Sequence, residues 1–299
     1  MGIAGMVTGA KSIIIPEVDP GLILKLIEQE KIQHTIFVPA VILFLIQHPD
    51  SANTDFSSLE TVIYGASPIT DDTLLKAMEL MDCNFWQVYG LTETNGAITF
   101  LYPEDHDVSR GKLRSCGKAA KGVGLRVVDS EDQDVPIGEV GEVIIKSELN
   151  MKGYWNRPEA TAEAIKDGWF YSGDVGYFDD EGFLYIHDRV KDMIVSGGEN
   201  IYPAEVENAL LSHPNIADAA VIGIPDDKWG EATKAFIVQV EGEKLSEDEV
   251  ISYARTQIAG YKCPKTVDHI NELPRNPSGK ILRKDLRAPF WEGKERNVS

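Results

Sequence analysis

Strand signals and helix signals alternate over the first third of the chain, and this alternation limits the possible folds more than any other feature. Asp19 can cap a helix and Pro20 can begin it, because the apolar residues that follow recur at helical spacing. Residues 70–81 show a second helical pattern, and apolar runs predict strands at residues 35–38, 60–64 and 84–88. Strands that alternate with helices are typical of an α/β fold with a parallel sheet.

The pattern changes twice further along the chain. From about residue 115, short strands divided by Gly, Pro and Asp turns are expected at residues 125–128, 142–146 and 183–186, which predicts antiparallel β structure. After Asp188 the signals become α+β, with a helix near residues 204–211 and strands at residues 219–222 and 235–240. Ser246 and Glu249 form a capping box for a last helix that should end at Gly260.

The predicted architecture is therefore the remnant of a large α/β domain followed by a small α+β C-terminal domain. The large domain is expected over residues 1–188, with an α/β part at 1–114 and an antiparallel β subdomain at 115–188. The C-terminal domain is expected over residues 189–299. Residues 1–10 carry no start signal for a helix or strand, so we expect the sequence to begin inside an element.

Charge and cysteine usage exclude several classes of protein. A formal net charge of −19 repels phosphate backbones and anionic lipid, which argues against nucleic-acid binding. Three widely spaced cysteines without partners at metal-ligand spacing fit a reducing cytoplasm, namely Cys83, Cys116 and Cys263. The longest nearly apolar run, residues 35–46, contains Pro39 and is too short to span a bilayer, so no membrane span is expected.

Two motifs follow predicted parallel strands, where ligands bind in open α/β sheets. In Tyr89-Gly90-Leu91-Thr92-Glu93, Glu93 can ligate Mg²⁺ and Thr92 can donate a hydrogen bond to a phosphate oxygen. Taken alone, this pentapeptide is more often a turn with an exposed glutamate. The small residues of Gly65-Ala66-Ser67-Pro68 would let the backbone approach a flat ligand such as adenine, although such a segment is usually a tight turn.

Three later segments add charged groups. Asp174, at the end of a Tyr-Ser-Gly-Asp segment, could accept hydrogen bonds from both hydroxyls of a ribose, but a Gly-Asp pair is usually just a turn. Four charges crowd residues 188–192 before the flexible Ser196-Gly197-Gly198, and the ordinary interpretation is a solvated linker. Lys280 ends a predicted loop, residues 274–280, in a basic C-terminal stretch, and by itself it would be a surface lysine.

In their order and separations, these five segments together resemble the adenylate-forming superfamily of acyl-CoA synthetases, nonribosomal peptide synthetase adenylation domains and beetle luciferases. The similarity runs from near residue 1 to about Arg287 and includes residues 153–159 with Thr161. Residues 198–203, with Glu205 and Glu207, are most similar to fatty or aryl acyl-CoA ligases. The resemblance implies an enzyme that joins a carboxylic acid to coenzyme A through an acyl-adenylate, with ATP as substrate and Mg²⁺ as cofactor.

The resemblance also implies roles for individual residues. Lys280 would assist adenylation and Lys191 would be the hinge about which the C-terminal domain rotates. Arg189 would meet the ribose together with Asp174, while Gly197 and Gly198 would line the pantetheine channel. The resemblance assigns the other residues to the binding of ATP, with Glu93 as the Mg²⁺ ligand: Gly65, Ala66, Ser67, Pro68, Tyr89, Gly90 and Thr92.

One departure from the superfamily pattern concerns ATP. The superfamily places a Ser/Thr/Gly-rich phosphate-binding loop ending in Gly-x-Pro-Lys upstream, and this sequence does not contain one. We therefore expect a truncated synthetase. Three alternatives remain open: a non-catalytic fragment, one chain of a split synthetase whose partner chain supplies the missing segment, and an amino-acid adenylating domain.

Overall fold

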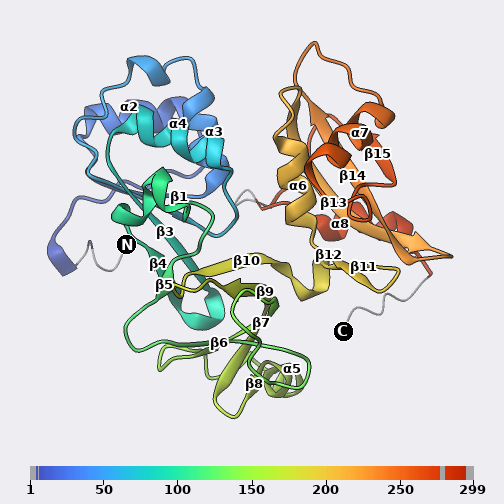
Figure 1. The fold of residues 1–299 in the computed structure, drawn as a ribbon. Coiled ribbons are helices and arrows are strands. Elements are labelled where there is room, and N and C mark those ends of the chain that lie inside the picture. Colours follow the sequence, from blue (N-terminus) through green and yellow to red (C-terminus); the bar gives the residue numbers. More distant parts are fainter. Residues whose placement is uncertain (1–4, 6, 277–279, 294–299) are drawn as a thin grey trace. The chain divides into compact units, whose positions relative to one another are not determined.

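The structure is a computed structural model that describes residues 5, 7–276 and 280–293. The chain divides into two compact units, one up to Lys121 and one from Gly122 onward. Figure 1 labels the helices and strands of both units. Within the part of the chain that is described, no helix combines the length and apolar character that crossing a bilayer requires.

The first unit contains one five-stranded sheet with the order β1-β2-β3-β4-β5. Strands β1 (His34–Phe37), β2 (Thr61–Gly65) and β3 (Asn84–Leu91) are parallel, as the alternating signals predict. Strands β4 (Gly96–Leu101) and β5 (Lys118–Ala119) were not predicted, and both pair antiparallel. The sheet is therefore mixed, because the short turn after β3 leads the chain straight back alongside that strand.

Three helices build the core of this unit with the parallel strands: α2 (Pro20–Gln29), α3 (Pro39–Gln47) and α4 (Asp71–Met81). The predicted start of α2 is confirmed, since Pro20 is its first residue and Asp19 Oδ1 accepts a hydrogen bond from the Leu22 amide at 3.0 Å. Side chains of all three helices pack with β2 and β3 in one apolar cluster that includes Leu24, Ile42, Leu74, Val62 and Phe85. The apolar sides of the helices thereby hold β2 and β3 in the core of this unit.

The second unit begins with an antiparallel sheet, as predicted. Its order is β10-β9-β7-β6, and β8 pairs with β9. The elements are β6 (Gly124–Val128), β7 (Gly141–Lys146), α5 (Pro158–Ala164), β8 (Ile165–Lys166), β9 (Trp169–Phe178) and β10 (Leu184–Arg189). Residues 171–174 lie inside β9, a strand that the sequence analysis did not predict.

A second sheet of this unit has the order β12-β11-β14-β13, and β15 pairs parallel with β14. Its strands are β11 (Ile194–Ser196), β12 (Glu199–Ile201), β13 (Ile216–Asp226), β14 (Gly230–Gln239) and β15 (Thr266–His269). Its helices are α6 (Pro203–Leu211), α7 (Glu247–Gln257) and α8 (Arg283–Arg287). The capping box of α7 is confirmed, but the helix ends at Gln257 and not at Gly260.

The two faces of this sheet are covered by different segments. Ala219 and Val221 of β13 pack in one apolar cluster with residues of α6 and α7. Ala220 and Ile222 point the other way and pack with residues from the end of the described chain, namely Leu273, Ile281, Leu286 and Phe290. This alternation positions the segment that carries Lys280. The predicted domain boundary at residues 188–192 stays a prediction, and the turn Val190–Asp192 simply joins β10 to β11.

Candidate functional site

The first group of predicted site residues gathers at one edge of the first sheet. Because β2 and β3 are parallel neighbours, with Gly65 paired to Val88, their carboxyl ends lie side by side. Ala66, Ser67 and Pro68 directly follow β2, and Thr92 and Glu93 directly follow β3. The structure thus brings both motifs to the edge where open α/β sheets bind ligands.

Two residues of this group need a correction. Tyr89 and Gly90 lie inside β3, whereas the motif was expected to form a loop after the strand. Gly90 is also required by its neighbours, because an added Cβ would lie 2.0 Å from the Gly96 carbonyl oxygen. At Gly65 an added Cβ would lie 2.1 Å from the Val88 carbonyl oxygen. Strand spacing alone therefore accounts for both glycines, and their part in adenine binding stays a prediction.

A short turn, Thr92–Thr94, presents Thr92 and Glu93 beyond the end of β3. The buried Thr94 hydroxyl fixes this turn, since it accepts a hydrogen bond from the Leu91 amide at 3.0 Å and contacts the Gly96 carbonyl oxygen at 2.8 Å. The sequence analysis did not single out Thr94, although a threonine three residues after the end of a strand is a recognisable local cap. Thr92 is exposed and Glu93 is half-buried.

The role of Glu93 as a magnesium ligand stays a prediction. Among the residues that the structure describes, no cluster of three or more His, Cys, Asp or Glu could form a metal cage. Magnesium is usually held by only one or two carboxylates together with substrate phosphates and water. One glutamate at the edge of the sheet therefore suits this mode of binding.

The second group lies in the second unit and is built on β9 and β10. A bulge in β9 separates the pairs Glu142–Val175 and Ile144–Tyr171, and Gly173 adopts a left-handed φ of 67° within it. Asp174 also lies within this bulge and is buried. Its Oδ1 lies 3.0 Å from Arg189 Nε, and the two residues are direct partners across β9 and β10. The two residues expected to meet the ribose therefore contact each other.

Lys280 belongs to the same group. Partial desolvation lowers the pKa of the Lys280 ammonium from its ordinary value, and the positive charges of Arg189 and Lys191 act in the same direction. The carboxylates of Asp174 and Asp192 oppose this decrease. Lys280 nevertheless remains accessible to solvent. The charges of Lys191, Arg189 and Asp174 thus act on Lys280.

Local contacts shape the chain around Lys280. The Lys280 amide donates to Asn276 Oδ1 at 2.9 Å, and its carbonyl oxygen accepts from the Asn276 amide at 2.9 Å. Arg275 and Ile281 then form an antiparallel bridge. Residues 277–279 of the predicted loop lie outside the described residues.

Gly197 and Gly198 form the two-residue turn between β11 and β12, where Ser196 pairs with Glu199. Both glycines have positive φ, at 63° and 86°, which suits a tight hairpin and corrects the expectation of a flexible linker. The Gly197 amide donates to the Trp229 carbonyl oxygen at 2.8 Å, and an added Cβ at Gly197 would lie 2.7 Å from the Trp229 ring. Trp229 is a neighbour that the sequence analysis did not identify.

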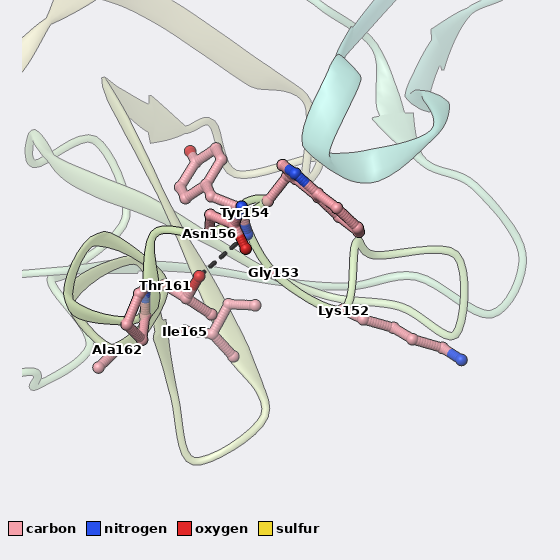
Figure 2. Close-up of a pocket in the computed structure, with 9 residues that line it drawn as sticks. Lys152, Gly153, Tyr154, Asn156, Thr161, Ala162 and Ile165 are labelled. Atoms are coloured by element: carbon pink, nitrogen blue, oxygen red, sulfur yellow. Dashed lines mark hydrogen bonds between the residues drawn. The ribbon is translucent and has the colours of Figure 1, made fainter.

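The motif at residues 153–159 lines an open cavity of about 580 Å³ with Thr161, Ala162 and Ile165. Figure 2 shows Thr161 directed at the backbone of Tyr154, where its Oγ1 accepts a hydrogen bond from the amide at 2.9 Å. The same hydroxyl donates to the Arg157 carbonyl oxygen at 2.8 Å. Gly153 packs on Thr161 so closely that an added Cβ would lie 2.7 Å from Thr161 Cγ2. These contacts give the motif a structural role in closing its own loop.

Known families match both ends of the chain. Residues 1–155 match the AMP-binding enzyme family, and residues 205–280 match the AMP-binding enzyme C-terminal domain. The fatty acid–[acyl-carrier-protein] ligase ScoC of Streptomyces coeruleorubidus is 41% identical over 262 residues, which are 88% of this chain and 50% of that protein. A feruloyl-CoA synthase of an Amycolatopsis species is 40% identical over 285 residues, which are 95% of this chain and 57% of that protein.

Solved structures give the same result. The o-succinylbenzoate CoA synthetase MenE of Bacillus subtilis, in complex with the acyl-adenylate intermediate OSB-AMP, matches with a TM-score of 0.85 and 33% identity. The match covers 99% of this chain and 58% of that one. The chain spans about half the length of the curated relatives it matches. Because the first family alone matches more than half of the residues, the chain belongs to the AMP-binding enzyme family, within the adenylate-forming superfamily.

Proposed function

We propose that the chain belongs to an acid–thiol ligase that activates a fatty or aryl carboxylic acid with ATP and transfers the acyl group to coenzyme A. The observation that carries this proposal is the group formed by Lys280, Arg189 and the buried Asp174. Two cations beside one carboxylate suit a nucleotide, whose ribose offers hydroxyl donors and whose phosphates are anionic. The acid class follows from the relatives, whose names are those of a fatty acid ligase and a feruloyl-CoA synthase.

The first step joins the carboxylate of the acid to the α-phosphorus of ATP and releases pyrophosphate. The nucleophile is already ionised at neutral pH, so the barrier is mainly the repulsion between two anions and their alignment. Lys280 would offset the negative charge that grows on the phosphate oxygens, and it is accessible for this purpose. Magnesium held at Glu93 would supply further neutralisation of the phosphates when bound.

By the resemblance, each of the two groups of residues has its own part in ligand binding. Asp174 and Arg189 would hold the ribose, because Asp174 can accept hydrogen bonds and Arg189 can only donate them. Thr92 would donate to a phosphate oxygen from its position beyond β3. Gly65, Ala66, Ser67 and Pro68, together with Tyr89 and Gly90, would form the wall against adenine and the acyl group.

The second step would require the C-terminal part of the chain to turn. The turn Val190–Asp192 contains Lys191 and joins the two sheets of the second unit, so a rotation there would move Lys280 away from the nucleotide. The Gly197–Gly198 turn would then admit the pantetheine arm, because neither residue carries a side chain. The thiol of coenzyme A would attack the acyl carbonyl carbon and AMP would leave.

Pyrophosphate release tests the first step. The purified chain is assayed with ATP, Mg²⁺ and a pool of fatty and aryl acids, beside Lys280→Ala. We expect acid-dependent release that falls on the order of 10² to 10³-fold in Lys280→Ala. Lys284→Ala is the matched control, because it removes an exposed lysine four residues away. A loss of tenfold or less in Lys280→Ala would contradict the proposed role.

The second step and the identity of the thiol need separate assays. Supplied acyl-adenylate is offered with coenzyme A or with a phosphopantetheinylated carrier protein, and thioester formation is measured. Faster transfer to the carrier protein would replace coenzyme A in the proposal. If thioester forms but a folded sample releases no pyrophosphate, a partner chain that binds the ATP phosphates becomes the requirement for the first step.

A further inference from the structure

The segment that carries Lys280 is fastened to its unit by ion pairs on both sides. Before Lys280, Arg275 Nη2 lies 2.7 Å from Asp218 Oδ2 of β13. After it, Arg283 makes two hydrogen bonds to the buried Glu207 of α6, at 3.1 Å from Nε and 2.6 Å from Nη2. Both acidic partners belong to the sheet of β13 and its covering helix, so these pairs hold the segment onto that layer.

A third ion pair connects the segment to the turn Val190–Asp192. Arg287, the last residue of α8, places Nη2 at 3.2 Å from Asp192 Oδ1 and Nη1 at 3.5 Å from the Lys191 carbonyl oxygen. Its side chain is 15% exposed and that of Asp192 is 12% exposed, so solvent screens this pair only weakly. Asp192 and Lys191 belong to the turn that directly follows Arg189. Arg287 therefore connects the Lys280 segment to the strand that carries the partner of Asp174.

The attachment of α8 does not depend on Arg287. Leu286 and Phe290 pack on the face of the sheet formed by Ala220, Ile222 and Phe236, and the Trp291 indole donates to the Gly223 carbonyl oxygen at 3.0 Å. These contacts and Arg283 already hold α8. The bonds of Arg287 therefore serve mainly to hold the turn at residues 190–192 in place. The Arg287–Asp192 pair therefore sets the separation between Lys280 and the Asp174–Arg189 pair.

We propose that Arg287 is a positioning residue which, by holding Asp192 and the Lys191 carbonyl, keeps Lys280 beside the Asp174–Arg189 pair. The consequence for adenylation rests on the proposed function, while the geometric consequence does not. Arg287 itself would touch neither ATP nor the acid. Its effect on the reaction would pass through Lys280.

The geometric consequence is measured without any enzyme activity. Acetic anhydride labelling of Lys280, followed by mass spectrometry across a pH series, reports the fraction of neutral amine. Partial desolvation and the charge of Arg189 lower the pKa of Lys280 in the native protein. In Arg287→Ala we expect this pKa to rise toward its ordinary value, which moves the labelling curve to higher pH. Lys284→Ala, on the exposed side of the same helix, should leave the curve in place.

Two further variants distinguish the loss of the Arg287 contact from a general loss of structure. Asp192→Glu keeps the negative charge, which itself raises the pKa of Lys280, but displaces the carboxylate from its place beside Arg287, so it should move the curve in the same direction as Arg287→Ala. Arg287→Lys keeps the charge but loses the planar fork, so it should restore part of the native curve. Circular dichroism and thermal unfolding identify folded samples. An unchanged curve in folded Arg287→Ala and Asp192→Glu would overturn the proposal.

The catalytic consequence separates this proposal from the proposed function. If the chain adenylates, Arg287→Ala should lower kcat by about 10 to 10²-fold while KM for ATP changes little, because misplaced catalytic groups act mainly on the transition state. Arg287→Lys should recover part of kcat. A shifted labelling curve in a protein that releases no pyrophosphate would support the positioning role and count against the proposed function alone.

Discussion

At the scale of single residues, close backbone approach explains more of the glycines than ligand binding does. Gly65 and Gly90 each lie against a carbonyl oxygen of a neighbouring strand, and an added Cβ would approach within 2.1 Å and 2.0 Å. Glycine at these positions lets β2, β3 and β4 pair at normal spacing up to the edge where the motifs gather. Gly65 and Gly90 can then also contact a ligand, although strand spacing is what requires glycine at both positions.

Gly65→Ala should therefore destabilise the first unit before it affects any ligand. We expect a loss of about 1 to 3 kcal/mol, as for other overpacked sites, because the Val88 carbonyl belongs to backbone that cannot move aside cheaply. Amide hydrogen exchange in β2 and β3 measures this loss locally. Gly260→Ala is the control, since an added Cβ there meets nothing within 4 Å, and an equal loss in both variants would contradict the explanation.

The residues that sequence reasoning missed are those defined by distant partners. A carboxylate after glycine resembles a turn in the sequence, and only the pairing of Asp174 with Arg189 of β10 shows that it belongs to a strand. Asp192 and Arg287 are 95 residues apart in the sequence, so no local pattern could pair them. Thr94 was within reach, because its contacts are local.

At the scale of elements, helix starts were predictable and strand lengths were not. Asp19, Ser246 and Glu249 each accept from an amide three residues away, and Pro20 has the φ of a first helical residue, so these effects can be predicted from the sequence. Strand β3 runs to Leu91 because β4 pairs with it antiparallel, and β4 gave no clear signal of its own. The apolar pattern thus predicted the parallel strands with their helices and missed the antiparallel additions.

The capping box of α7 offers a quantitative test at this scale. Ser246 Oγ accepts from the Glu249 amide at 3.3 Å, and Glu249 Oε2 accepts from the Ser246 amide at 2.8 Å. Ser246→Ala should destabilise α7 by about 1 kcal/mol. Hydrogen exchange of the amides in its first turn measures this value. Glu249→Gln keeps an acceptor oxygen and should cost less, and the reverse order would contradict the assigned cap.

At the scale of the whole molecule, a strongly acidic chain needs a local group of positive charges wherever it binds an anion. The net charge is −19, yet Arg189, Lys191 and Lys280 lie close enough to influence one another. Arg189 is paired with Asp174, and three arginines of the C-terminal stretch, Arg275, Arg283 and Arg287, are paired with other acidic residues. The basic C-terminal stretch seen in the sequence therefore has two uses, one in fastening the segment and one at the candidate site.

The proposed rotation of the C-terminal part of the chain about residue 191 can be tested directly. Proline fixes φ and restricts the residue before it, so Lys191→Pro should hinder the turn. We expect thioester formation from supplied acyl-adenylate to fall more than pyrophosphate release does, because only the second step requires the rotation. Lys284→Ala again controls for the loss of one positive charge. Equal losses in both steps would remove the hinge role from this position.

The pair between Arg287 and Asp192 is little exposed. A salt series can therefore separate the rate at which ATP associates with the protein from the placement of Lys280. Added salt would weaken the long-range repulsion between an acidic protein and anionic ATP, and association would become faster. A pair that solvent barely reaches would keep its geometry over the same range of salt. The rate of association with the nucleotide would thus depend on salt concentration, whereas the position of Lys280 would not.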